Sequence, residues 1–186
     1  MRAKQYNMAV FASAGHHNHD SGAIGSGTQE NIETIKLRDA VVSICKSIGI
    51  KVITDNDSET LGQYLDRIKT GDGSVVVEFH FDASGTGKAT GATSIVGSDA
   101  DRLDKAFAKE LVDVTSSTIG IKNRGVISEA DSHRGRLGLM REQGIVALLE
   151  VCFIDNQNDI NLYRENFSYL ALQIAKVIDK YEKMVV

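Results

Sequence analysis

The chain of 186 residues contains no proline, only two cysteines and no long apolar run. A helix needs roughly 20 consecutive apolar residues to cross a bilayer, so the sequence predicts no transmembrane segment. Cys45 and Cys152 lie far apart in apolar stretches, which favours buried thiols over a disulfide or a reactive site. The chain also lacks internal repeats, low-complexity tracts and linker-like segments. Its length and apolar content of 42% therefore predict one domain over residues 1–186.

The charge balance excludes a further class of protein. Asp and Glu total 25 against 21 Lys and Arg, a net charge of -4. A nucleic-acid-binding chain normally carries a basic stripe, so no nucleic acid is expected as a partner. An anionic membrane surface is not expected either. The apolar segment that follows residue 7 is too short for the core of a signal peptide, so the sequence predicts a chain made in the cytoplasm without an export signal.

Strand-like and helical patterns alternate along the chain. Strand-like runs cover residues 8–13, 50–54, 75–83, 92–96, 125–128 and 145–154, and amphipathic helical patterns cover about 29–48, 59–69, 99–119 and 158–183. This alternation predicts an α/β fold with a mostly parallel, twisted sheet of about six strands and helices on both faces. The most apolar runs, 75–77 and 145–149, are expected at the centre of the sheet.

Side chains that can bind a metal stand at the ends of these apolar runs. His16 directly follows the first strand-like run, His80 lies near the end of the third, and Glu150 follows the run 145–149. Functional residues of α/β sheets gather beyond the carboxyl ends of the strands. Two imidazoles and a carboxylate are a common ligand set of catalytic zinc, with a fourth position left open. The pattern indicates a metal-dependent hydrolase, although no local H-x-x-x-H spacing is present.

His80 also has a purely structural interpretation. Alternation along a strand places Glu78, His80 and Asp82 on one face and Phe79 and Phe81 on the other. Either acid on that face could hold the imidazole by a hydrogen bond, with or without a metal on its other nitrogen.

The two glutamates have similar alternatives. A buried Glu150 could form an ion pair instead of transferring protons. The candidate partners are Arg124, Arg134 and Arg141. Thr28 is a candidate N-cap that would place Glu30 in the first turn of a helix. There, Glu30 could simply be a surface acid that interacts favourably with the helix dipole.

The order of these motifs resembles a known family. The motifs are Ala14-Gly15-His16, the glycine-rich loop 20–25, Glu30, the strand 78–83, Arg124-Gly125-Val126 and the closing segment 148–156. In this order they resemble the zinc-dependent N-acetylmuramoyl-L-alanine amidases of the amidase-3 type, which occur in bacterial autolysins and phage endolysins. The resemblance extends from about residue 8 to residue 180.

The resemblance implies a site and a reaction. His16, Glu30 and His80 would bind one Zn²⁺ per chain, and Glu150 would be the catalytic acid and base. The substrate would be peptidoglycan, and a zinc-activated water would cleave the amide between N-acetylmuramic acid and L-alanine of the stem peptide.

Further expectations concern the substrate and the setting. Arg124 and Arg134 are candidates for binding carboxylates of the stem peptide, and His133 is a further substrate-side candidate. The chain would be a single catalytic domain without a wall-binding domain. It would act on the cell wall, after release through a holin or lysis if it is phage-derived. The alternative functions are a zinc exopeptidase acting on peptides and a catalytically silent wall-binding module of the same fold.

Overall fold

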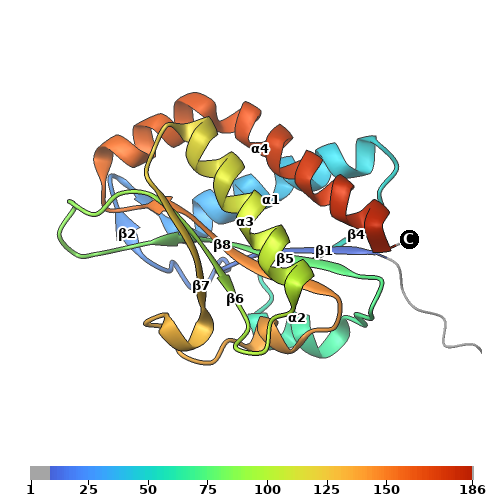
Figure 1. The fold of residues 1–186 in the computed structure, drawn as a ribbon. Helices are drawn as coiled ribbons and strands as arrows, with labels where there is room; N and C mark the ends of the chain where they lie inside the picture. The colour runs from blue at the N-terminus through green and yellow to red at the C-terminus, as the bar shows by residue number, and fades with distance from the viewer. Residues whose placement is uncertain (1–8, 186) are drawn as a thin grey trace, which may run out of the picture.

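A six-stranded sheet forms the centre of the computed structural model, which describes residues 9–185 (Figure 1). Its strands are β1 (Val10–Ala14), β4 (Val52–Thr54), β5 (Val75–Asp82), β6 (Ala92–Val96), β7 (Asn123–Ser128) and β8 (Ile145–Phe153). A separate hairpin pairs β2 (Ile24–Gly25) with β3 (Thr28–Gln29). The helices are α1 (Glu30–Ser47), α2 (Leu61–Arg67), α3 (Arg102–Ile119) and α4 (Gln157–Val185), with short 3₁₀ helices η1 (Glu129–Asp131) and η2 (Gly138–Arg141).

The strand order is β4-β1-β5-β8-β6-β7. Strands β4, β1, β5 and β8 run parallel, and β7 runs parallel to β6. Within the described residues, the one antiparallel pairing of this sheet joins β6 to β8. The predicted mostly parallel sheet is therefore confirmed. The carboxyl ends of β1, β5 and β8 meet at one edge, where β6 begins.

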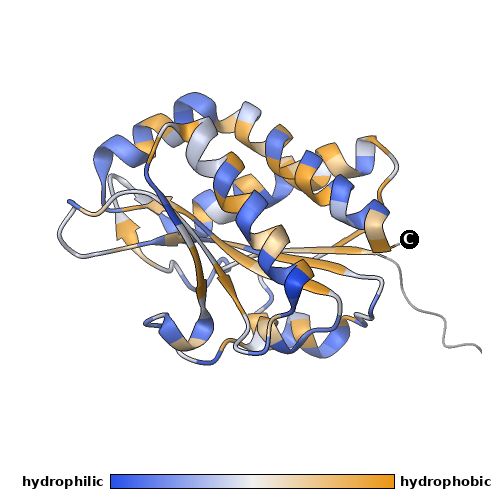
Figure 2. Cartoon of the chain, in the orientation of Figure 1, coloured by the Kyte–Doolittle hydropathy of each residue, from blue (hydrophilic) through white to orange (hydrophobic). Residues whose placement is uncertain are grey.

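Helices cover both faces of the sheet, but unequally (Figure 1). The long helices α1, α3 and α4 pack on one face, and the short α2 and η2 pack on the other. Strands β5 and β8 are buried along almost their whole length, as expected for central strands. Apolar residues dominate these strands, whereas the covering helices carry both apolar and polar residues (Figure 2).

Alternation along β5 and β8 decides which side chains face the long helices. Phe79 and Phe81 belong to the core beneath α1, α3 and α4, together with Leu149 of β8. Leu148 belongs to the opposite core, beside α2 and η2. His80 and Glu150 follow the even-numbered alternation, so they lie on this second face of the sheet.

The start of α1 differs from the prediction in one respect. Glu30 is the first residue of the helix, as expected, but the N-cap is Gln29, whose side chain makes no capping hydrogen bond in the described part of the chain. Thr28, the predicted cap, belongs to β3 and donates its hydroxyl to Glu33 Oε1 at 2.8 Å. The hairpin with β2 holds both residues before the helix in a strand, which leaves Thr28 one residue too early to cap.

The structure also tests the predictions about the two cysteines and about membrane-spanning segments. Cys45 and Cys152 are buried as free thiols, which confirms their assignment to the core. Burial raises the pKa of the Cys45 thiol to about 12, so this thiol is not reactive near neutral pH. Among residues 9–185, no helix combines the length and apolar character that crossing a bilayer requires.

Candidate metal centre and active-site cleft

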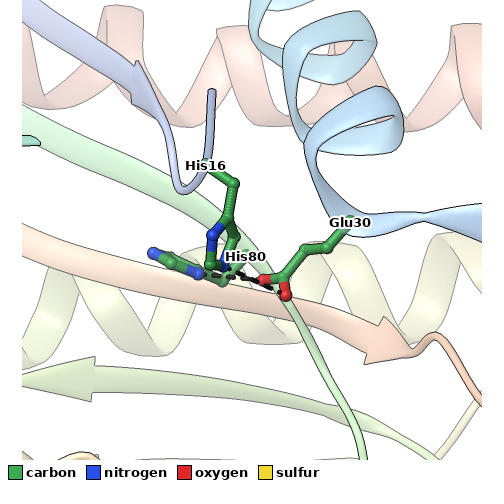
Figure 3. Close-up of side chains that lie close together, drawn as sticks. All are labelled: His16, Glu30 and His80. Atoms are coloured by element: carbon green, nitrogen blue, oxygen red, sulfur yellow. Dashed lines mark hydrogen bonds and ion pairs between the residues drawn. The ribbon is translucent and has the colours of Figure 1, made fainter. Parts of the chain in front are cut away.

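Three predicted residues converge at the carboxyl-end edge of the sheet (Figure 3). His16 follows β1, Glu30 begins α1 and His80 lies in β5. One ligand atom from each lies within 4.8 Å of the other two, and this group could hold a metal ion. The turn after β1 is anchored because Gly15 N donates to Phe79 O of the neighbouring strand at 2.8 Å. The structure thus brings together the three residues that the family resemblance implied as metal ligands.

Each imidazole has one nitrogen directed at the shared carboxylate. His16 Nε2 lies 3.2 Å from Glu30 Oε2, and His80 Nδ1 lies 3.0 Å from Glu30 Oε1. The opposite nitrogens contact other acids: His16 Nδ1 lies 2.9 Å from Asp20 Oδ2, and His80 Nε2 lies 3.0 Å from Glu78 Oε1. Metal-binding histidines are typically oriented in this way by an outer carboxylate. His16 Nε2 and His80 Nδ1 are therefore the atoms available to a metal.

Two glycines make room for these side chains. A Cβ atom at Gly15 would lie 2.3 Å from Cε1 of His80. At Gly22, which has a φ of +60°, a Cβ would lie 2.5 Å from Cδ2 of His16 and 2.7 Å from Glu30 Oε2. Side chains essentially never approach this closely, so the close packing of His16, Glu30 and His80 requires glycine at both positions.

Burial and mutual contacts determine the charge of the group. Burial opposes ionisation of Glu30, but hydrogen bonds with His16 and His80 outweigh it and hold the pKa of this carboxyl well below its usual range. Burial likewise opposes protonation of His80, yet its hydrogen bonds with Glu30 and Glu78 raise the pKa to about 10. The pKa of His16 is also raised, by Glu30 and Asp20 against burial. The acids of this site thus stabilise positive charge at the place where the ligand atoms converge.

Glu150 lies beside this group, in register with His80 on the adjacent strand. It is 3% exposed, and its Oε1 accepts from Arg134 Nε at 2.9 Å. The other oxygen, Oε2, is buried and has no hydrogen-bond partner within residues 9–185. Burial raises the pKa of Glu150 to about 6, against the opposing effect of His80 and Arg134. A carboxyl whose pKa lies this close to neutrality can both accept and donate a proton.

The ion-pair alternative for Glu150 is also realised, with Arg134. This guanidinium additionally lies 4.0 Å from Glu30 Oε1, so it faces both glutamates. The other two candidate partners make different contacts. Arg124 stacks over the ring of Phe153 at 5.1 Å, and Arg141 donates to Leu137 O at 2.7 Å.

A cleft of about 420 Å³ opens beside Glu150 and extends over β6 and β7. Arg124, Arg134 and His133 line it, so the predicted substrate-side residues share one cavity. Thr93, Ile95 and Ile127 contribute from the strands, and Asp82, Lys122, Asn123, Asp131 and Ser132 complete the lining. Lys122 and Asp131 were not predicted, because exposed charged residues beside strand ends are common and carry no distinctive local pattern.

Comparison with known proteins places this chain in a family. The Amidase_3 family model, described as N-acetylmuramoyl-L-alanine amidase, matches residues 10–180. An uncharacterized protein of Clostridium perfringens is 31% identical over 192 residues, covering 94% of this chain and 52% of its own length. The chain therefore spans about half the length of the curated relatives it matches.

Solved structures share the fold. An N-acetylmuramoyl-L-alanine amidase from Clostridium difficile superposes with a TM-score of 0.80 at 19% identity, covering 97% of this chain and 98% of that one. The catalytic domain of the amidase CwlV from Bacillus (Paenibacillus) polymyxa gives a TM-score of 0.76 at 24% identity, covering 95% and 99%. The family model extends over nearly all the described residues. By this match, the chain belongs to the Amidase_3 family of N-acetylmuramoyl-L-alanine amidases.

Proposed function

We propose that this chain is the catalytic domain of a zinc-dependent amidase that acts on peptidoglycan. The bond cleaved is the amide between the lactyl group of N-acetylmuramic acid and L-alanine of the stem peptide. The observation that carries the proposal is the convergence of His16, Glu30 and His80, whose ligand atoms lie within 4.8 Å of one another, in a chain of this family. The cell wall as the place of action is part of the same proposal.

The donor set suits zinc. Two neutral imidazoles and one carboxylate satisfy three positions of a four-coordinate ion and leave the fourth open, as in hydrolytic zinc enzymes. His16 Nε2, the Glu30 carboxylate and His80 Nδ1 would hold one Zn²⁺ per chain. A zinc ion there would supply Lewis acidity, which lowers the pKa of water to about 7 and polarises a carbonyl oxygen. Asp20 and Glu78 would keep the two imidazoles in the ligating orientation.

Glu150 would transfer the proton. As water adds to the amide carbon and the C–O bond forms, the carboxylate takes a proton from that water. It then passes this proton to the leaving nitrogen of L-alanine as the C–N bond breaks. Support comes from the buried oxygen Oε2 without a hydrogen-bond partner among the described residues, and from a pKa raised to about 6.

The substrate would lie in the cleft over β6 and β7. Arg124 and Arg134 line this cleft and carry charges that complement the carboxylates of a stem peptide. Ile95 and Ile127 offer apolar contact in the same cavity. We infer that these arginines bind the peptide side of the substrate. This assignment is supported by their place in the cleft and their charge.

The test is zinc content measured together with amide cleavage. Purified protein is stripped with a chelator, reloaded with Zn²⁺ and incubated with purified peptidoglycan, and newly exposed L-alanine amino groups are counted. We expect one zinc per chain and amine release that depends on it. His80→Ala should lose both, whereas Glu150→Gln should keep the zinc and lose the release.

The rival functions give different results in the same assay. A zinc exopeptidase would release amino acids from free peptides and leave the muramoyl amide intact. A silent wall-binding module would sediment with peptidoglycan without releasing amines. Either result would overturn the proposed amidase activity.

A further inference from the structure

Arg38 of α1 is a buried arginine surrounded by acids. It is 2% exposed and stands two helical turns after Glu30. Its Nη1 donates to Asp55 Oδ1 at 2.6 Å and to Asp55 O at 3.3 Å, and its Nη2 donates to Asp57 Oδ1. Its Nε donates to the neighbouring Asp39 at 2.8 Å. One guanidinium thus ties α1 to the segment that follows β4.

The same segment holds the turn that carries His16. Ala14 N donates to Asp55 Oδ1 at 3.2 Å, and Asn18 N donates to Asp57 O at 2.6 Å. These two amides lie two residues before and two residues after His16. The turn is therefore fastened on both sides of the histidine by Asp55 and Asp57, two of the three acids that Arg38 binds.

Stability alone is a poor reason for this arrangement. The free-energy cost of removing a guanidinium and a carboxylate from water offsets much of their electrostatic attraction. Well-packed apolar residues often stabilise a core equally well. A guanidinium instead fixes direction, because its donors form a rigid planar fork. Here the fork orients Asp55 and Asp57 relative to the helix whose first residue is Glu30. Arg38 thereby relates the positions of two metal-ligand candidates from different parts of the chain.

We propose that Arg38, Asp55 and Asp57 form a positioning cluster that sets His16 against Glu30 for metal binding. The inference rests on the proposed function, because it requires a metal at His16, Glu30 and His80. None of the three residues belongs to the proposed metal-binding group or lines the cleft. The cluster acts through the hydrogen bonds to Ala14 and Asn18.

Two conservative variants test the cluster. Arg38→Lys keeps the charge but cannot fork to both carboxylates, and Asp55→Asn removes one charge while keeping an oxygen for the amide of Ala14. Asp104→Asn is the matched control, because Asp104 Oδ1 also accepts from a strand amide, Val146 N, at 2.8 Å. Val146 lies near the amino end of β8, at the edge of the sheet opposite the metal-binding group.

The readouts are metal binding and site geometry. The dissociation constant for Zn²⁺ is measured by competition with a chromophoric chelator, and the visible absorption of the Co²⁺-loaded protein reports coordination. Groups that hydrogen-bond directly to metal ligands contribute about 10- to 100-fold in metal affinity, and this cluster acts one contact further from the ligands. We therefore expect a loss near the lower end of this range, about tenfold, with an altered Co²⁺ spectrum, for Arg38→Lys and Asp55→Asn. Asp104→Asn should have the Zn²⁺ affinity and the Co²⁺ spectrum of the parent protein.

Unfolding of the metal-free proteins separates positioning from stability. If both cluster variants unfold more easily but bind Zn²⁺ as tightly as the parent, the cluster only stabilises the fold and the inference is overturned. If one variant does not fold, the Zn²⁺ affinity of the other variant, compared with its unfolding, decides the question. A parent protein that binds no Zn²⁺ overturns the proposed function itself, and this is seen before any variant is compared.

Discussion

Substituting alanine at Gly15 tests the close packing on which the proposed metal centre depends. The added Cβ would lie 2.3 Å from Cε1 and 2.4 Å from both ring nitrogens of His80. Ordinary contact begins near 3.4 Å, so the ring or the turn must move by about 1.1 Å (3.4 minus 2.3). Metal–ligand distances tolerate only about 0.2 Å, so a shift of this size removes His80 from a shared site.

The expected results follow from that displacement. Overpacking of a close-packed region costs roughly 1–3 kcal/mol, which a denaturant titration of the metal-free protein would detect. The free energy of zinc binding should change more than the free energy of unfolding, because the substitution displaces the His80 ring from the position needed for metal binding. Amidase activity should fall by at least about 100-fold, as a misplacement of about 1 Å does in other active sites.

A glycine elsewhere supplies the matched control for this variant. Gly62 lies in α2, where the nearest atom to an added Cβ is Thr60 Oγ1 at 4.0 Å. Gly62→Ala should leave zinc binding unchanged and stabilise the protein by roughly 0.5–1 kcal/mol, since alanine favours the helix. If Gly15→Ala bound Zn²⁺ with the affinity of the parent, the argument from steric contact with His80 would be refuted.

Four further predictions concern charge. Glu150→Gln should lower amide hydrolysis by about 10²–10⁴-fold while zinc content, measured by elemental analysis, stays at one per chain; unchanged turnover would remove Glu150 from proton transfer. Glu30 and Glu78 raise the pKa of His80 to about 10, so this imidazole is protonated at neutral pH and zinc must displace its proton. The affinity for Zn²⁺ should therefore rise about tenfold per pH unit for each proton displaced. Calorimetry in buffers of different ionisation enthalpy would count those protons, and zero release would contradict the assignment. Below the ordinary pKa of 6.5 the raised pKa of His80 also stabilises the metal-free fold, and this contribution should disappear as the pH rises through about 10. Arg134→Met removes a positive charge that lowers the pKa of Glu150, so this pKa should rise further. The acidic limb of the pH–rate profile should then move to higher pH, and KM for peptidoglycan should rise. An unmoved profile would argue against the ion pair between Arg134 and Glu150.

Local patterns account for much of the fold. The apolar runs of β5 and β8 indicate central strands because a strand with no polar face must be covered on both sides. The alternation around His80 indicates which face it occupies, because successive side chains of a strand point in opposite directions. These features depend only on neighbours in the chain. The prediction of a capping Thr28 was wrong because β3 pairs with β2 in a tight hairpin, which places the N-cap at Gln29.

Contacts between distant segments could not be read from the pattern. The reversed direction of β6 and β7 leaves no trace in the composition of those strands, since a strand looks the same whichever neighbour it pairs with. A charged residue on a helix ordinarily indicates a solvated face, yet Arg38 is buried because the segment after β4 brings two acids to it. Likewise, three arginines were candidates for Glu150, and only packing of the loop after η1 brought Arg134 there.

The sequence by itself thus determined the helices and strands and the kinds of side chain at their ends. Through the order of its motifs it also determined the expected site residues His16, Glu30, His80 and Glu150. The tertiary structure alone decided which nitrogen of each histidine faces Glu30, which acids hold the other nitrogens and which arginine meets Glu150. Periodicity reports the environment of single residues along a strand or helix. Pairing across the site depends on how loops close and side chains pack, and these are properties of the whole chain.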